Sequence, residues 1–174
     1  MLAGCTSTTA GTAAPGAVPS SSAVARPRAV KVDGVDPCRL LTEPQQADFK
    51  IDEWEAEQSN PGTGTKSPSC AYNLNGPKSA AYRVTLVADK GIEFWNGSGN
   101  LDVVPRTVSG FPAVQVTFKG TSTLECSVTV DVADGQQMFV QFLPYAPEGF
   151  VQDEMCRNAT KGAEAALATL QTLK

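Results

Sequence analysis

Histidine is absent from the 174 residues of this chain. It is the usual general base of serine and cysteine enzymes and the commonest side-chain ligand of transition metals. Its absence excludes the Ser-His-Asp and Cys-His catalytic arrangements. We therefore expect a protein that is not an enzyme and that has neither a metal site nor a cofactor.

Basic side chains and long apolar runs are also in short supply. The 14 Lys and Arg residues are outnumbered by 18 Asp and Glu, which gives a formal net charge of −4. Nucleic-acid binding needs a basic face against the phosphates, so nucleic acid is excluded as a partner. No apolar run reaches the ~20 residues of a membrane-spanning helix, so we expect no such span.

An enzyme without histidine would depend on paired carboxylates or on a Ser-Lys arrangement. Acidic residues gather in one predicted loop and again around the start of the last predicted helix: Asp52, Glu53, Glu55 and Glu57, then Glu148, Asp153 and Glu154. Such clusters are more often solvated, or complement a helix dipole, than catalytic. A carboxylate-based hydrolase is therefore kept only as a minor alternative.

The first residues, Leu2-Ala3-Gly4-Cys5, resemble a bacterial lipobox. In a lipobox the cysteine becomes the new N-terminus and carries acyl chains that anchor the protein to a membrane. Only Met1 precedes Leu2, so we expect residues 1–5 to be the remnant of a signal peptide and lipobox. The motif predicts a secreted lipoprotein, held by Cys5 on the outer face of the cytoplasmic membrane.

Residues 6–32 consist largely of Ser, Thr, Ala, Pro and Gly, and their only sizeable apolar side chains are isolated valines. Such a segment buries too little surface to offset the entropy of ordering, so we predict a disordered tether. Residues 33–174 then form a single domain, large enough for its own core and expected to be monomeric.

Four further cysteines are spread through this domain: Cys38, Cys70, Cys126 and Cys156. An even, dispersed set in a secreted chain indicates two disulfides, whereas a zinc site usually draws its ligands from closely spaced pairs. Four cysteines allow three connectivities, and the sequence does not decide among them. Chain order favours Cys38 with Cys70 and Cys126 with Cys156.

Capping residues and hydrophobic periodicity predict the elements of the domain. Asp36-Pro37-Cys38 is typical of a helix start, and Thr42 with Gln45 predicts a capped helix over 43–49 whose inner face and approach carry Leu40, Leu41, Ala47 and Phe49. Residues 52–68 read as a loop, and 90–100 as a helical turn or loop. Apolar positions at intervals of three and four predict a final helix over 149–173.

Alternation of apolar and polar residues predicts five strands, at 70–74, 82–87, 113–119, 125–133 and 138–142. Asp134-Gly135 is a hairpin signal between the last two. We expect an α+β fold: an antiparallel sheet of about five strands, with the short N-terminal helix and the long C-terminal helix packed on one face.

Several motifs resemble a family of small actinobacterial lipoproteins of unknown function: the D-P-C-R-L-L-T run at 36–42, S-C-A-Y at 69–72, G-F-P-A at 110–113, and the last two cysteines. The resemblance implies an exported, lipidated protein with two disulfides and no established activity. It carries over no catalytic residue. The expected layer order is also similar to the Mog1/PsbP-type fold, which says little about function.

Large aromatic residues recur in the predicted loops, turns and segment ends: Trp54, Phe94, Trp95, Phe111, Tyr145 and Phe150. They either cap the core or form a patch for an envelope protein, a glycan or a lipid. We expect a non-enzymatic binding or accessory lipoprotein of the cell envelope. The alternative is a carrier that holds a lipid or other apolar ligand between the sheet and the C-terminal helix.

Overall fold

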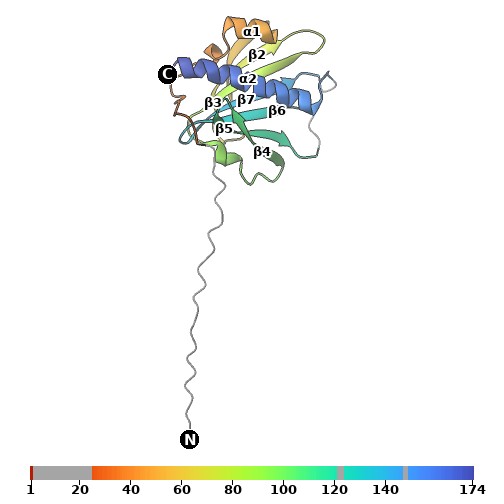
Figure 1. The fold of residues 1–174 in the computed structure, drawn as a ribbon. Helices are drawn as coiled ribbons and strands as arrows, with labels where there is room; N and C mark the ends of the chain where they lie inside the picture. Colours follow the sequence, from red (N-terminus) through yellow and green to blue (C-terminus); the bar gives the residue numbers. More distant parts are fainter. Residues whose placement is uncertain (2–24, 121–123, 147–148) are drawn as a thin grey trace.

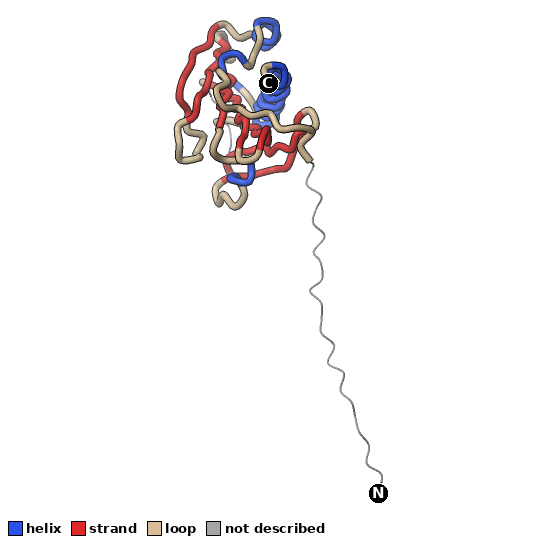
Figure 2. The backbone as a smooth tube through the Cα atoms, turned by 90° about the vertical axis from the view of Figure 1, so that its left-hand side faces the viewer, coloured by secondary structure: helices blue, strands red, loops and turns tan. Residues whose placement is uncertain are grey.

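The structure, a computed structural model, describes residues 1, 25–120, 124–146 and 149–174 (Figure 1). Within these ranges, seven strands form one antiparallel sheet in the order β1-β2-β3-β7-β6-β5-β4. The strands are β1 (Glu53–Ser59), β2 (Ser67–Leu74), β3 (Ala80–Val87), β4 (Leu101–Val108), β5 (Phe111–Phe118), β6 (Cys126–Ala133) and β7 (Gln136–Pro144). The long helix α2 (Gln152–Thr172) crosses one face, and the strands curve around it (Figure 2).

This architecture confirms the α+β class but not the strand count, because two strands escaped prediction. β1 lies in the segment predicted as a loop, and no element was assigned to the residues of β4. Both are edge strands, and most of their side chains are exposed, so no alternation of apolar and polar residues marks them. Pro105 within β4 also weakens the strand signal and is tolerated because β4 lies at an edge.

The short helices follow the predicted caps. α1 (Glu43–Phe49) has the predicted bounds, and the backbone N–H of Thr42 donates to Gln45 Oε1 at 2.8 Å. The predicted start at Asp36 is a single 3-10 turn, η1 (Pro37–Arg39), and a second turn, η2 (Ile92–Trp95), lies where a helical turn or loop was expected. Ala47 was wrongly placed in the core: it is exposed, because the other side of α1 faces the sheet.

The face under α2 holds the main core. Five apolar positions of the predicted final helix are fully buried: Ala159, Ala163, Ala166, Leu167 and Leu170. Leu173, which the prediction also included in this helix, is exposed by 37% because it lies beyond the helix end. A Cβ on Gly162 would lie 2.8 Å from Cδ1 of Tyr82. The helix therefore packs directly against β3 and β7 at this point.

The structure pairs Cys38 with Cys70 and Cys126 with Cys156, the connectivity that chain order favours. The first bridge joins η1 to β2, and the second joins the early turns of α2 to the start of β6. Both bridges thus attach a helical element to the same face of the sheet.

Part of the segment assigned to the tether packs on the domain. Val30 and Val32 are buried, and Arg26 forms ion pairs with Asp131 and Asp134. The N–H of Val30 donates to the carbonyl of Val132, next to an irregularity in the β6 ladder. The lipobox, Cys5 and residues 6–24 lie outside the described residues. None of the described helices is long and apolar enough to cross a membrane.

Candidate functional site

The sheet face opposite α2 carries a row of side chains that runs across four neighbouring strands. The strand register places Arg83 opposite Gln141, Gln141 opposite Ser127, and Ser127 opposite Val116. Their chain neighbours, such as Tyr82 and Val140, point instead toward α2. The row therefore forms the floor of a separate surface on the second face of the sheet.

A cavity of about 470 Å³ lies over this row, and we call it the sheet pocket. Its walls come from η2, from the loops at 60–62 and 98–100, and from the sheet itself, including the end of β1. The apolar side chains of its lining, which we call the apolar half, are Phe94, Trp95, Leu101, Val116, Phe118 and Phe139. The polar side chains of the lining, which we call the polar half, include Asn60, Arg83, Asn100, Glu125, Ser127 and Gln141.

Gln137 fixes η2 and its tryptophan against the sheet. Its Nε2 group donates to the carbonyls of Lys90 and Gly91 at 3.1 and 3.3 Å, and its Oε1 accepts from Trp95 Nε1 at 2.7 Å. The Trp95 ring then stacks on Phe139, with centroids 5.1 Å apart and planes 13° apart. This network holds the apolar half of the sheet pocket in one arrangement.

Phe94 and Phe118 form the accessible part of the apolar half. Phe94 meets Trp95 edge to face, with ring centroids 5.3 Å apart. Phe94 is exposed by 36% and Phe118 by 38%, whereas Trp95 and Phe139 are nearly fully buried. A ligand in the pocket would therefore touch the two phenylalanines first.

Charged groups in the polar half are paired within the protein. The Nε group of Arg83 donates to Glu57, a neighbour on β1. Glu125 accepts hydrogen bonds from Gln141 Nε2 at 2.9 Å and from Ser127 Oγ at 3.5 Å. Burial raises the pKa of Glu125, against the opposing effects of the Gln141 hydrogen bond and the Arg83 charge. These side chains are held in place before any ligand arrives.

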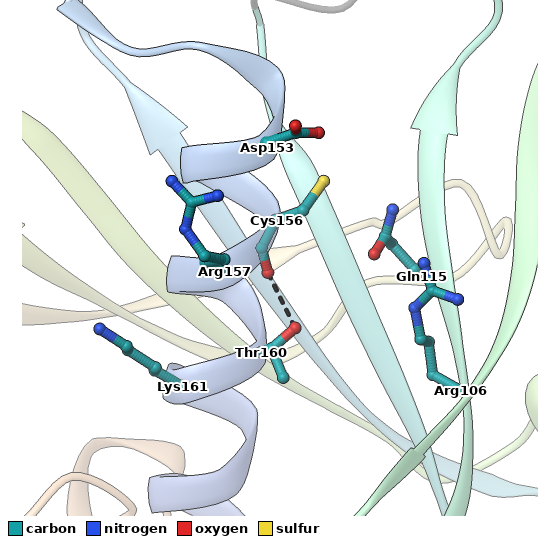
Figure 3. A pocket seen from close by; sticks show the side chains of 7 residues that line it. All are labelled: Arg106, Gln115, Asp153, Cys156, Arg157, Thr160 and Lys161. Carbon is teal, nitrogen blue, oxygen red and sulfur yellow. Dashed lines mark hydrogen bonds between the residues drawn. The ribbon is translucent and has the colours of Figure 1, made fainter.

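A second cavity, a shallow groove of about 430 Å³, runs between α2 and strands β4 and β5 (Figure 3). Arg157 and Lys161 extend on one side of the helix, away from Arg106 and Gln115 on the other. The hydrogen bond drawn among the lining residues runs from Thr160 Oγ1 to the carbonyl of Cys156 at 2.8 Å and is internal to the helix. Because its charged groups do not converge, the groove is a weaker candidate than the sheet pocket.

The predicted aromatic patch does not form one surface. Trp54 on β1 is exposed by 52% and Tyr145 after β7 by 59%, while Trp95 and Phe111 are exposed by 3% and 1%. Phe150 is partly buried and packs against the core ring of Phe142, at a centroid distance of 5.0 Å. A place in a surface patch is therefore wrong for Trp95 and Phe111, and their burial agrees with the alternative that these aromatics cap the core: Trp95 stacks on Phe139, and Phe111 belongs to the main core.

The predicted acidic clusters are dispersed over the structure. Asp52 accepts from the backbone N–H of Asn75 at 2.7 Å, Glu57 pairs with Arg83, and Glu154 lies 3.8 Å from Lys78. Glu53 and Glu55 lie on β1, Asp153 lies in the first turn of α2, and Glu148 is outside the described residues. Among the described residues, no group of three or more His, Cys, Asp and Glu side chains is arranged to hold a metal ion.

Sequence reasoning missed most of the sheet pocket. Arg83, Ser127 and Gln141 lie on the strand face that alternation assigns to solvent, and Phe139 was not singled out. The available signal was on β7, where Gln137 and Gln141 flank Phe139 on that same face. A large aromatic between two amides on a supposed solvent face indicates that something covers it.

The chain belongs to the family described as a protein of unknown function (DUF3558), whose model matches residues 1–169. This match confirms the resemblance to an uncharacterised family. No curated protein matches the chain, and no solved structure matches it.

Proposed function

We propose that this DUF3558 member is a lipid-anchored lipoprotein of the cell envelope that acts as a non-enzymatic binding module, and that it takes a small amphipathic molecule into the sheet pocket. The observation that carries the proposal is a single cavity whose lining combines aromatic and aliphatic side chains with polar ones. Its volume of about 470 Å³ falls within the range of small-molecule sites, roughly 300–1,000 Å³.

The envelope address is supported by the cysteines. Two disulfides are typical of chains that fold in an oxidising compartment. The lipobox-like start of the sequence supports an acyl anchor at Cys5. A location on the outer face of the cytoplasmic membrane accords with both features.

Binding accords with the site better than catalysis does. The sequence has no histidine to act as a general base, and Arg83 is paired with Glu57. A ligand between the sheet and α2, as in the carrier alternative, finds less support because the side chains there are buried against each other. The sheet pocket lies on the opposite face.

A photocrosslinking amino acid in living host cells tests the proposal. Benzoylphenylalanine in place of Phe118 puts the reactive group at the rim of the sheet pocket, and the same residue in place of Trp54 serves as the exposed control away from it. We expect mass spectrometry to find a small-molecule adduct at position 118 and none at position 54. Capture of the same protein partner at both positions, without a small-molecule adduct, would instead support an accessory role through exposed aromatics.

A further inference from the structure

We propose that the ligand of the sheet pocket presents an uncharged sugar ring, an inference that rests on the proposed function and specifies its ligand. Three features of the pocket bear on this ligand: the hydrogen-bonding atoms that remain available, the local charge, and the aromatic side chains of the apolar half. Each of the three narrows the chemistry of the ligand.

Hydrogen-bonding groups in the polar half are already oriented by bonds within the protein. Asn60 Oδ1 accepts from the N–H groups of Gly62 and Gly64 at 3.0 and 3.1 Å, which leaves its Nδ2 group as a donor. Arg83 uses its Nε group on Glu57, so its two Nη groups make no hydrogen bond to the described residues. Gln141 donates its Nε2 to Glu125, which leaves its Oε1 as an acceptor.

The polar half therefore offers fixed donors beside a fixed acceptor. A ligand that satisfies both needs groups that donate and accept at closely spaced positions. Hydroxyl groups have this property, because each carries one O–H donor and two acceptor lone pairs. Adjacent hydroxyls on one ring bring several such groups to the pocket at once.

Local charge disfavours an anion. Arg83 is the cation of the pocket lining, and the carboxylates of Glu57 and Glu125 both interact with it. An anionic ligand would meet two like charges for one opposite charge. A neutral polar ligand has no such penalty.

The apolar half offers aromatic surface to one face of a ring. Phe94 and Phe118 are exposed at the rim, and the stacked pair of Trp95 and Phe139 lies below them. The face of an aromatic ring carries partial negative charge, and the C–H groups on the face of a sugar ring carry the complementary partial positive charge. A purely apolar chain would instead leave the Asn60, Arg83 and Gln141 groups without partners.

Saturation-transfer NMR on the full chain with Cys5→Ser, which keeps it free of lipid, tests this inference. The probes are neutral oligosaccharides of glucose, galactose, mannose and arabinose, with glucuronic acid and decanoic acid for comparison. We expect transfer to the ring C–H protons of at least one neutral sugar and none to the two acids. In a Trp54→Phe background, Trp95 is the remaining tryptophan and its fluorescence gives the affinity.

Variants at the two halves of the pocket separate its contributions. Phe118→Ala removes one stacking face and should weaken sugar binding by about twofold to tenfold. Arg83→Lys keeps the charge beside Glu57 but loses the planar fork, so we expect about tenfold weaker binding. Val104→Ala is the matched control, since Val104 is exposed by 37%, pairs with Gln115 and points to the α2 side of the sheet. It should leave binding unchanged.

The outcomes distinguish this inference from the proposed function. Pocket-dependent binding of decanoic or glucuronic acid, or a sugar signal that Phe118→Ala and Arg83→Lys leave intact, overturns the sugar ring. If position 118 captures a small molecule in cells but no neutral sugar binds, the sugar ring is overturned and the binding function stands. If nothing is captured and no probe binds, both fall.

Discussion

At the scale of single residues, Tyr72 shows how one polar atom can organise a buried corner. Its side chain is fully buried, and its hydroxyl donates to the carbonyl of Pro37 at 2.8 Å and accepts from the N–H of Leu41 at 3.2 Å. Burial raises the pKa of Tyr72 to about 12, so the hydroxyl keeps its proton throughout the neutral range. One side chain thus fixes both ends of η1 beside the Cys38–Cys70 bridge.

Replacing Tyr72 with Phe should destabilise the fold by about 1–3 kcal/mol, because the buried Leu41 N–H and Pro37 carbonyl lose their partner. Urea unfolding should show a lower midpoint with an unchanged slope. Tyr82→Phe is the control: Tyr82 is also buried, but its hydroxyl makes no hydrogen bond to the described residues. Equal losses in the two variants would contradict the role given to the Tyr72 hydroxyl.

Glu125 predicts a dependence of stability on pH. Burial raises its pKa in the folded state, so the folded protein holds this proton more tightly than the unfolded chain does. The corresponding stability is present below the unfolded-state pKa and is lost as pH rises through the folded-state pKa. Glutamine keeps an acceptor for Gln141 but does not titrate.

The free energy of unfolding of Glu125→Gln, relative to the natural chain, should therefore rise as the pH is increased from about 4.5, the ordinary pKa of this carboxyl, through its higher folded-state pKa. Urea titrations of both proteins at several pH values measure this difference. A difference that stays constant over the range, or falls, would show that burial of Glu125 does not govern its ionisation.

At the scale of elements, the sequence predicts those strands whose two faces differ. β6 is recognisable because Val128 and Val130 alternate with Ser127 and Thr129, and α1 is recognisable because its capping box is local. β1 and β4 join the sheet through pairing with strands already in place. That pairing leaves little trace in a short window of sequence.

The packing of η2 and its neighbouring loops over the sheet face opposite α2 could not be predicted for the same reason. Alternation assigns Thr85 and Thr129 to solvent, yet both are fully buried because η2 and its neighbouring loops pack over them. The candidate site depends on this cover. Local sequence patterns therefore did not predict the site, whereas chain order favoured the disulfide pairing that the structure shows.

Helix α2 provides a prediction at this scale, because its close approach to the sheet depends on Gly162. Alanine usually stabilises a helix interior by about 1 kcal/mol over glycine. Here its Cβ would lie 2.8 Å from Tyr82 Cδ1 and 3.2 Å from Val140 Cγ1, so the helix must shift. We expect Gly162→Ala to lower stability by about 1–3 kcal/mol, since overpacking outweighs propensity.

Thermal unfolding followed by circular dichroism measures that change. Lys161→Ala, at the exposed neighbouring position, is the control and should change stability by less than about 0.5 kcal/mol. If Gly162→Ala instead stabilises the protein, α2 is not held as closely to β3 and β7 as the structure has it.

At the scale of the whole molecule, each disulfide fixes a different helical element to the sheet: Cys38–Cys70 holds η1, and Cys126–Cys156 holds α2. The bridges close stretches of 32 and 30 residues, and each should contribute roughly 3–4 kcal/mol by restricting the unfolded chain. Such bridges persist in oxidising compartments and are rare in the cytosol. The stability that the two bridges contribute would therefore be lost in a reducing compartment.

Export and anchoring therefore make a joint prediction about all the cysteines. In the native host, the natural chain should fractionate with membranes and Cys5→Ser should not, because the acyl chains on Cys5 hold it there. Maleimide labelling of the unfolded proteins should find no thiol in either form before reduction, and four in each after it, since a thioether-linked Cys5 does not react. Thiols that react without reduction, together with an unmodified Cys5, would place the protein in a reducing compartment. The location inferred from the lipobox and the location inferred from the disulfides would then both be wrong, because both require export across the cytoplasmic membrane.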